Sequence, residues 1–250
     1  MKKRKYIGVI YLLLIFVSCS IERDEKDQLY KDLIDKVGEA IQYEIKDKDL
    51  NAISIAIIKQ DAFFWAEGFG FIDKEKKIKA DKNTIYRVGS VSKLFTDIAI
   101  MKKSESGDID IDLPIQNYLP KFNPENTFNN EPITLRQLMS HRAGILREPA
   151  YGNYFADNET SLKKTVESVK NSSLIHPPGT ITKYSNAGIA VVGYTLEKVF
   201  QKPYVEFMQD NILNPLGMNA SSFEFKNSMS SNLAEATMWS YDGRSFKAPR

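Results

Sequence analysis

The fold of this chain is decided by one stretch, Tyr86-Arg87-Val88-Gly89-Ser90-Val91-Ser92-Lys93-Leu94-Phe95-Thr96. It contains a Ser-x-x-Lys pair, Ser90 and Lys93, and three residues of helix make nearly one turn, so both side chains share a face. A serine hydroxyl becomes a good nucleophile when a base takes its proton, and a desolvated lysine can be that base. If a helix begins at Ser90, its first backbone N–H groups can also stabilise an oxyanion.

The pair alone is weak evidence, because a chain of this length holds about one Ser-x-x-Lys by chance. A second one is present, Ser161-Leu162-Lys163-Lys164. It begins a polar amphipathic pattern, which predicts a helix that faces solvent. The assignment of Ser90 therefore depends on the segments around it.

Those segments carry a family resemblance. The Ser90 stretch resembles the nucleophile segment of the serine β-lactamase and penicillin-binding protein superfamily, in particular its class C and esterase-like branch. Further similar segments follow in order at 107–114, 133–144, 177–180, 184–188 and 215–218. The resemblance spans about residues 53–223. It implies an α/β (α+β) β-lactamase-like fold, with an antiparallel sheet flanked by helices and an all-helical subdomain over about 91–215.

The resemblance also implies roles for a Tyr-x-Asn motif, matched by Tyr184-Ser185-Asn186. Tyr184 is expected to move a proton between Ser90 and the leaving group, and Asn186 to hydrogen-bond substrate and Lys93. Tyrosine has a pKa near 10, so it can act as a base near neutral pH only if a cation such as Lys93 lowers that pKa.

Two other residues compete for these roles. Tyr151-Gly152-Asn153 is a second Tyr-x-Asn, but the motif at Tyr184 follows a Pro-Pro-Gly-Thr turn and precedes an Ala/Gly/Val-rich helix, as in the family. His141 could act as a base, but its place in the last helical turn before Gly144 favours a structural role at the helix end.

The family's third motif, a late strand with Lys-Thr-Gly or His-x-Gly, is not found after Met218. We therefore expect a domain truncated at its C-terminus, without the strand that supplies a second oxyanion donor. The leading interpretation is a serine hydrolase that forms an acyl-enzyme with a β-lactam, a D-alanyl peptide of cell-wall origin or an ester. The alternative is a catalytically inactive binding or sensing lipoprotein of the same fold. No cofactor or metal is implied.

Hydrophobic periodicity and turn residues predict the elements of the chain. We expect a helix over 28–47 and a two-stranded hairpin from 53–58 and 62–69, followed by a loop or short strand within 72–83. The remaining expected elements are helices at 91–105, 134–141, 160–171, 186–200 and 203–212, and late strands at 220–225 and 234–239.

The N-terminal sequence has the pattern of an export signal. Four basic residues, 2–5, precede an apolar run over 6–17 that is short for a membrane span of about 20 residues. This pattern predicts a signal peptide over 1–18, with an uncleaved anchor helix as the alternative. The ending Phe16-Val17-Ser18-Cys19 resembles the lipobox of bacterial lipoproteins.

That resemblance implies a lipid on Cys19. We then expect a tether over 19–28, a hydrolase domain over 29–250, and a location on the periplasmic or outer face of a bacterial envelope, with the lipid as the membrane contact.

Composition excludes other classes of protein. The 250 residues include one Cys and two His, too few for a Cys/His zinc site or a disulfide framework. The formal charge is +2, from 34 basic and 32 acidic residues, which gives no global reason to expect nucleic acid as a partner.

Overall fold

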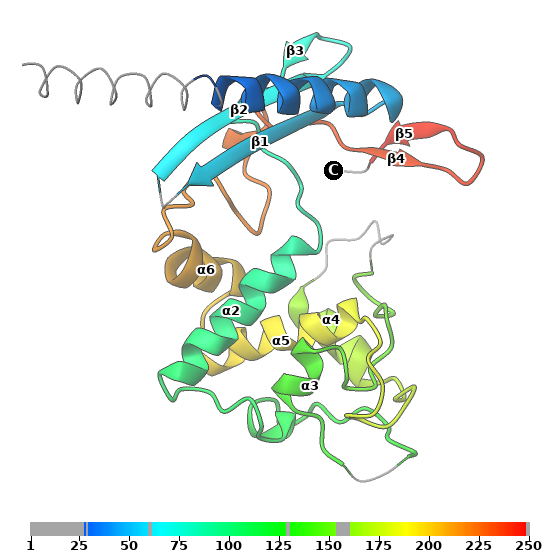
Figure 1. The fold of residues 1–250 in the computed structure, drawn as a ribbon. Coiled ribbons are helices and arrows are strands. Elements are labelled where there is room, and N and C mark those ends of the chain that lie inside the picture. Colours follow the sequence, from blue (N-terminus) through cyan, green and yellow to red (C-terminus); the bar gives the residue numbers. More distant parts are fainter. Residues whose placement is uncertain (1–27, 29, 60–61, 129–130, 154–160, 249–250) are drawn as a thin grey trace, which may run out of the picture. The chain divides into compact units, whose positions relative to one another are not determined.

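The computed structural model describes residues 28, 30–59, 62–128, 131–153 and 161–248. The predicted signal peptide, Cys19 and all of the tether except residue 28 lie outside these ranges. The chain divides into two compact units, one formed by Met1–Arg87 with Met229–Arg250 and the other by Val88–Ser228 (Figure 1). Within the described ranges, no helix combines the length and the apolar character needed to cross a membrane.

The first unit is built on an antiparallel sheet. Strands β1 (Ala52–Lys59), β2 (Ala62–Asp73) and β3 (Ile78–Lys79) lie in the order β1-β2-β3. The expected hairpin is confirmed, with Ile53 opposite Phe69. A helix over 30–47 runs along β1 and β2 (Figure 1).

The helix and the sheet pack closely where the helix has a glycine. A Cβ added to Gly38 would lie 3.6 Å from the Phe69 ring, which is ordinary van der Waals contact. Phe69 of β2 therefore serves the packing of this unit, as the β-branched and aromatic composition of the two strands predicts.

The last residues of the chain complete the first unit. Strand β4 (Thr237–Trp239) pairs with β5 (Ser245–Lys247), so the strand expected over 234–239 is confirmed in part, whereas β5 has no counterpart in the sequence prediction. The Glu235 backbone N–H donates to the Ile72 carbonyl at 2.9 Å, which ties this segment to the end of β2.

The strand predicted over 220–225 is wrong. The Ser221 N–H closes a turn on the Met218 carbonyl at 3.1 Å, and the Phe223 ring stands edge-on to Tyr204 at 5.3 Å. The apolar residues of this segment are used by the helical core instead of a sheet, and this is why a local pattern misidentified them.

The second unit is helical. Its elements are α2 (Val91–Glu105), η1 (Ile115–Asn117), α3 (Leu135–Met139), α4 (Leu162–Lys170), α5 (Asn186–Val199), α6 (Tyr204–Met208) and the π-helical turn η2 (Gln209–Leu213). The 3-10 turn η3 (Asn227–Met229) follows at the boundary of the units. The five predicted helices are confirmed, with ends that differ by a few residues.

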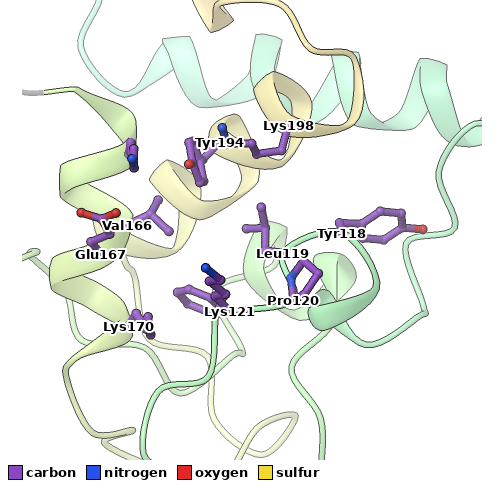
Figure 2. A pocket seen from close by; sticks show the side chains of 11 residues that line it. Tyr118, Leu119, Pro120, Lys121, Val166, Glu167, Lys170, Tyr194 and Lys198 are labelled. Carbon is purple, nitrogen blue, oxygen red and sulfur yellow. The ribbon is translucent and has the colours of Figure 1, made fainter.

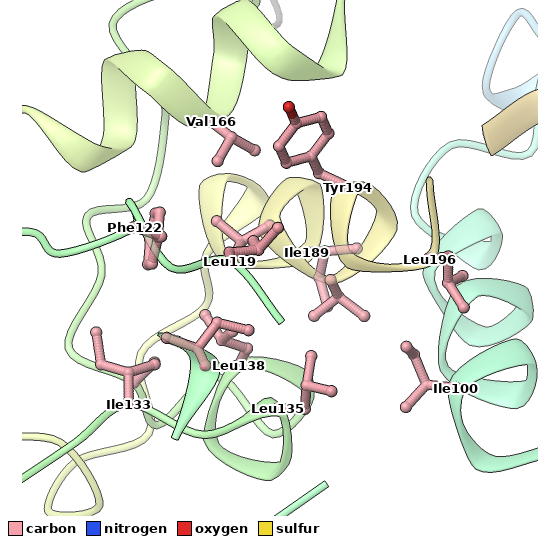
Figure 3. Packing of buried hydrophobic residues seen from close by; sticks show 14 of the residues in the cluster. Ile100, Leu119, Phe122, Ile133, Leu135, Leu138, Val166, Ile189, Tyr194 and Leu196 are labelled. Atoms are coloured by element: carbon pink, nitrogen blue, oxygen red, sulfur yellow. The ribbon is translucent and has the colours of Figure 1, made fainter. Parts of the chain in front are cut away.

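Helix α5 is the centre of this unit, and α2, α3, α4 and α6 all pack against it. Buried side chains surround it on several sides, among them Ile100, Leu135, Leu138 and Val166 (Figure 3). A helix that is apolar on most of its faces must be enclosed by other elements. The position of its first turn is therefore fixed by the core.

The helix starts show how the site is positioned. The Ser185 hydroxyl accepts the Gly188 N–H at 2.8 Å and caps α5, whereas Ser90, the residue before α2, makes no capping bond with its side chain. A serine at an N-cap usually spends its hydroxyl on a backbone N–H. The Ser90 hydroxyl is left for other partners.

Candidate active site

Ser90 and Lys93 lie as the sequence predicts. Ser90 is exposed at the start of α2 with helical backbone angles, φ −69° and ψ −8°. Lys93 is one turn further along, and its Nζ donates to Ser90 Oγ at 3.0 Å. A cation at this distance stabilises negative charge on the serine oxygen.

Tyr184 reaches the same oxygen from a distant part of the chain. Its hydroxyl lies 2.6 Å from Ser90 Oγ, and Lys93 Nζ lies 5.0 Å from the centroid of its ring. The competing Tyr151 instead has Lys164 of α4 over its ring at 5.8 Å. The structure therefore brings Ser90, Lys93 and Tyr184 together and leaves the other Tyr-x-Asn apart from them.

The surroundings of Tyr184 lower the pKa of its hydroxyl. Burial alone would raise this pKa, but hydrogen bonds with Lys93 and Ser90 and the positive charges of Lys93 and Arg147 outweigh it. The Arg147 guanidinium lies 5.4 Å from the ring centroid. Arg147 was missed in the sequence, where it is one more charged residue after a glycine turn.

His141 supports Tyr184 from the other side. The two ring centroids are 4.7 Å apart, and His141 Nδ1 accepts the Ser185 backbone N–H at 3.3 Å. Burial, and then the charge of Lys93, lowers the pKa of His141, which keeps the ring neutral and able to accept. The residue lies beyond the end of α3 with φ 59°, and not in the last turn of the helix as the sequence suggested.

Asn186 is the first residue of α5. Its side chain has a different hydrogen-bond partner from Lys93, the one expected from the sequence. Its side-chain amide donates to Glu148 Oε1 at 2.6 Å, and the structure shows no bond between this amide and Lys93. The Asn186 backbone N–H donates to the Arg147 carbonyl at 2.8 Å. The NH₂ end of the amide is therefore taken by Glu148, and a bond to Lys93, which can only donate, would have to use the Asn186 carbonyl oxygen.

Glu148 is a further residue of the site that the sequence did not reveal. Its Oε1 also lies 3.4 Å from Arg147 Nε. In the sequence, only their location could have pointed to Arg147 and Glu148, because they follow the segment 133–144 that resembles the family. Two adjacent residues thus place opposite charges beside Tyr184 and Asn186.

Asp97 lies one turn beyond Lys93 on α2. Its Oδ1 is buried and has no hydrogen-bond partner among the residues described. Burial raises the pKa of Asp97 to about 6, against the opposing effect of the Lys93 charge. Burial of the Asp97 carboxyl therefore outweighs the favourable charge of Lys93, which lies one turn away on the same helix.

A family model described as Beta-lactamase matches residues 31–249, most of the chain and all of the residues above. The chain belongs to the beta-lactamase family. Its mixed helices and antiparallel strands are the fold of that family, which includes serine hydrolases. The fold class predicted from the sequence is therefore confirmed.

Individual proteins of this family and solved structures are also similar to this chain. Protein flp of Staphylococcus aureus (strain N315) is 27% identical over 203 residues, which are 81% of this chain and 41% of that protein. The octameric penicillin-binding protein homologue from Pyrococcus abyssi has 30% identity and a TM-score of 0.74, over 86% of this chain and 50% of that one. A class C beta-lactamase at 18% identity and TM-score 0.71, covering 86% and 57%, shares the fold. The chain thus spans about half the length of the relatives it matches.

Proposed function

We propose that this beta-lactamase family chain carries the nucleophile, the proton-transfer group and an amide-binding residue of a serine hydrolase. The observation that carries the proposal is the position of Ser90 Oγ, 3.0 Å from Lys93 Nζ and 2.6 Å from the Tyr184 hydroxyl. A hydroxyl held between a cation and a tyrosine of lowered pKa is prepared for attack on a carbonyl.

Acylation follows from this geometry. The Ser90 proton passes to the Tyr184 phenolate as Oγ bonds to the carbonyl carbon, and Lys93 remains an ammonium that stabilises both oxygens. The tetrahedral intermediate collapses, the bond to the leaving group breaks, and Tyr184 returns the proton to that group. Water then attacks the acyl-enzyme by the same route in reverse.

The start of α2 offers a donor for the oxyanion. The Ser90 backbone N–H makes no hydrogen bond with any residue in the described part of the chain. It lies at the positive end of a 15-residue helix. A carbonyl oxygen that becomes negative as Oγ attacks would be stabilised there.

The substrate class is an amide or ester carbonyl. Solved relatives include a hydrolase with promiscuous acyltransferase activity, EstCE1, and a beta-lactamase/D-alanine carboxypeptidase from Yersinia pestis. We carry these classes over as candidates: an ester, a β-lactam or a D-alanyl peptide. Asn186 would hold the N–H of an amide substrate through its carbonyl oxygen.

We also propose that Cys19 carries a lipid and anchors the exported protein to a bacterial membrane. The basic start, the short apolar run and the ending Val17-Ser18-Cys19 support this. Cells that express the protein and are fed labelled palmitate should label the wild type and not Cys19→Ser. Equal labelling of both would contradict the assignment.

The hydrolase is tested by covalent labelling. A fluorophosphonate and a fluorescent penicillin are added to the full chain, to Ser90→Ala and to Ser161→Ala, the serine of the second Ser-x-x-Lys. We expect labelling of the wild type and Ser161→Ala and none of Ser90→Ala. Labelling by the fluorophosphonate alone identifies an esterase, and labelling by neither reagent would favour the inactive binding protein.

A further inference from the structure

We propose that the helical unit has a second site, which binds a small anionic amphiphile: a phosphate or carboxylate group joined to an apolar chain. The site is a cavity of about 510 Å³ between the segment 118–122, α4 and α5. Figure 2 shows side chains from all three elements around the same space. Cavities of this size commonly hold small organic ligands.

The cavity shares no residue with the candidate active site. Its nearest point on α5 is Tyr194, eight residues after Asn186, which corresponds to about 12 Å of helix rise. A ligand held here would lie beside the second half of the central helix, whereas Ser90 and Tyr184 lie at its start. The inference therefore does not depend on the proposed hydrolase activity.

The charge of the lining favours an anion. Four lysines line the cavity and Glu167 is the one carboxylate among the lining residues. None of these lysines forms an ion pair with a carboxylate in the described ranges. The four are Lys121, Lys163, Lys170 and Lys198. An anionic group would meet several unpaired ammonium groups at once, and charge-assisted hydrogen bonds are the strongest that a surface cavity offers.

The floor of the cavity favours an apolar chain. Leu119, Phe122 and Val166 line it and are at most 6% exposed. They belong to the same hydrophobic cluster as α5 (Figure 3). A hydrocarbon segment laid on these side chains would remove apolar surface from water. An inorganic anion would use the lysines and leave the floor empty.

Tyr194 adds a neutral hydrogen-bond donor to the lining of the cavity. Its side chain is 9% exposed and lines the cavity, and its hydroxyl has no hydrogen-bond partner in the described part of the chain. Lys198 Nζ lies 5.1 Å from the centre of its ring. This hydroxyl is open to solvent at the cavity, so it can donate to a ligand oxygen beside the Lys198 cation.

The test measures binding of octyl phosphate to the full chain by calorimetry. Lys163→Ala, which lines the cavity, is compared with Lys164→Ala, its neighbour on α4 that contacts Tyr151 instead. We expect Lys163→Ala to weaken binding about tenfold and Lys164→Ala less than about twofold. Tyr194→Phe keeps the buried ring and should weaken binding about fivefold, without a loss of thermal stability.

Further ligands separate the contributions. Inorganic phosphate should bind at least about tenfold more weakly than octyl phosphate, because it leaves the apolar floor uncovered. Octyltrimethylammonium should not compete with octyl phosphate. Absence of octyl phosphate binding, equal effects of the two lysine variants, or equal binding of the cationic amphiphile would each overturn the proposal.

Sedimentation with lipid vesicles distinguishes two possible ligands, a lipid headgroup and a soluble anion. If phosphatidylglycerol vesicles sediment with the wild type and less with Lys163→Ala, the ligand is a lipid headgroup. If octyl phosphate binds and vesicles do not, the ligand is a soluble anion. All arms are repeated on Ser90→Ala, which lacks the proposed nucleophile, so retention of binding there separates this site from the hydrolase.

Discussion

The Asn186 side-chain amide donates to the Glu148 carboxylate at 2.6 Å, which fixes the direction in which the amide points. An ionised carboxylate can only accept, so the NH₂ end must face Glu148 and the carbonyl oxygen must face away. That oxygen accepts no hydrogen bond from the described residues. The pair therefore leaves an acceptor unused, which in the proposed hydrolase would favour substrates that carry an N–H donor.

Replacement of Glu148 should consequently affect amide substrates more than esters. Glu148→Gln can offer its own NH₂ to Asn186 and permits the amide to flip. We expect kcat/KM to fall about fivefold for an amide substrate and less than about twofold for the matching ester, since one hydrogen bond is worth about 1 kcal/mol. Steady-state kinetics on the substrate pair measures this. Equal losses on both substrates would show that Glu148 has only a structural role.

Tyr184→Phe removes the proton-transfer group and preserves the ring against His141. The acylation rate should fall by about 10²–10⁴, the usual contribution of a positioned acid or base. The phenolate is the active form, so acylation by the wild type should rise with pH until the lowered pKa of Tyr184 and then level off. Stopped-flow labelling with a chromogenic substrate would follow both effects.

Two variants test whether this pH dependence belongs to Tyr184. Arg147→Ala removes a charge that lowers the Tyr184 pKa, and so the rise should move to higher pH. Tyr151→Phe, at the second Tyr-x-Asn, should match the wild type at every pH. A pH profile that persists in Tyr184→Phe would exclude the tyrosine as its origin.

The sequence and the structure agree best where the signal is local. The pair Ser90 and Lys93 was predictable because three residues of helix place two side chains on one face, and α2 begins where that pattern requires. Tyr184 came from the ordered motifs of the family. Arg147 and Glu148 could not be found this way, because their roles arise from hydrogen bonds between the loop 144–148 and the start of α5. Strand β5 was likewise unpredictable, since its three exposed residues form no apolar pattern.

Asp97→Asn should make the protein more stable at neutral pH. The pKa of Asp97 is about 6 in the folded state and its ordinary value is 3.8, so the folded state holds a proton that the unfolded state releases between these values. Stability therefore falls as pH rises from about 4 to 6 and is constant above. With allowance for solvent screening, the asparagine variant should gain about 1 kcal/mol at pH 7.

Asp108→Asn is a matched control, because we expect it to change stability at neutral pH in the opposite direction to Asp97→Asn. Hydrogen bonds with Ser106 and Lys103 lower the pKa of Asp108, so its ionised form stabilises the folded state and Asp108→Asn should lose stability at neutral pH. Chemical unfolding of both variants between pH 4 and 7 tests the pair. A loss of stability in Asp97→Asn would mean that its charge is compensated in the folded protein.

Gly144 supports the loop that carries Arg147 and Glu148, and a side chain there should be costly. Gly144 has φ +77°, and an added Cβ would lie 2.2 Å from the His176 carbonyl oxygen. Gly107 has nearly the same backbone angle, φ +79°, with nothing within 4 Å of an added Cβ. Gly107→Ala therefore measures the left-handed strain alone, about 1 kcal/mol. Gly144→Ala adds a clash with backbone and should cost at least about 3 kcal/mol. The thermal midpoints of the two variants, followed by circular dichroism, compare these costs directly, and equal midpoints would show that the loop can move away from His176.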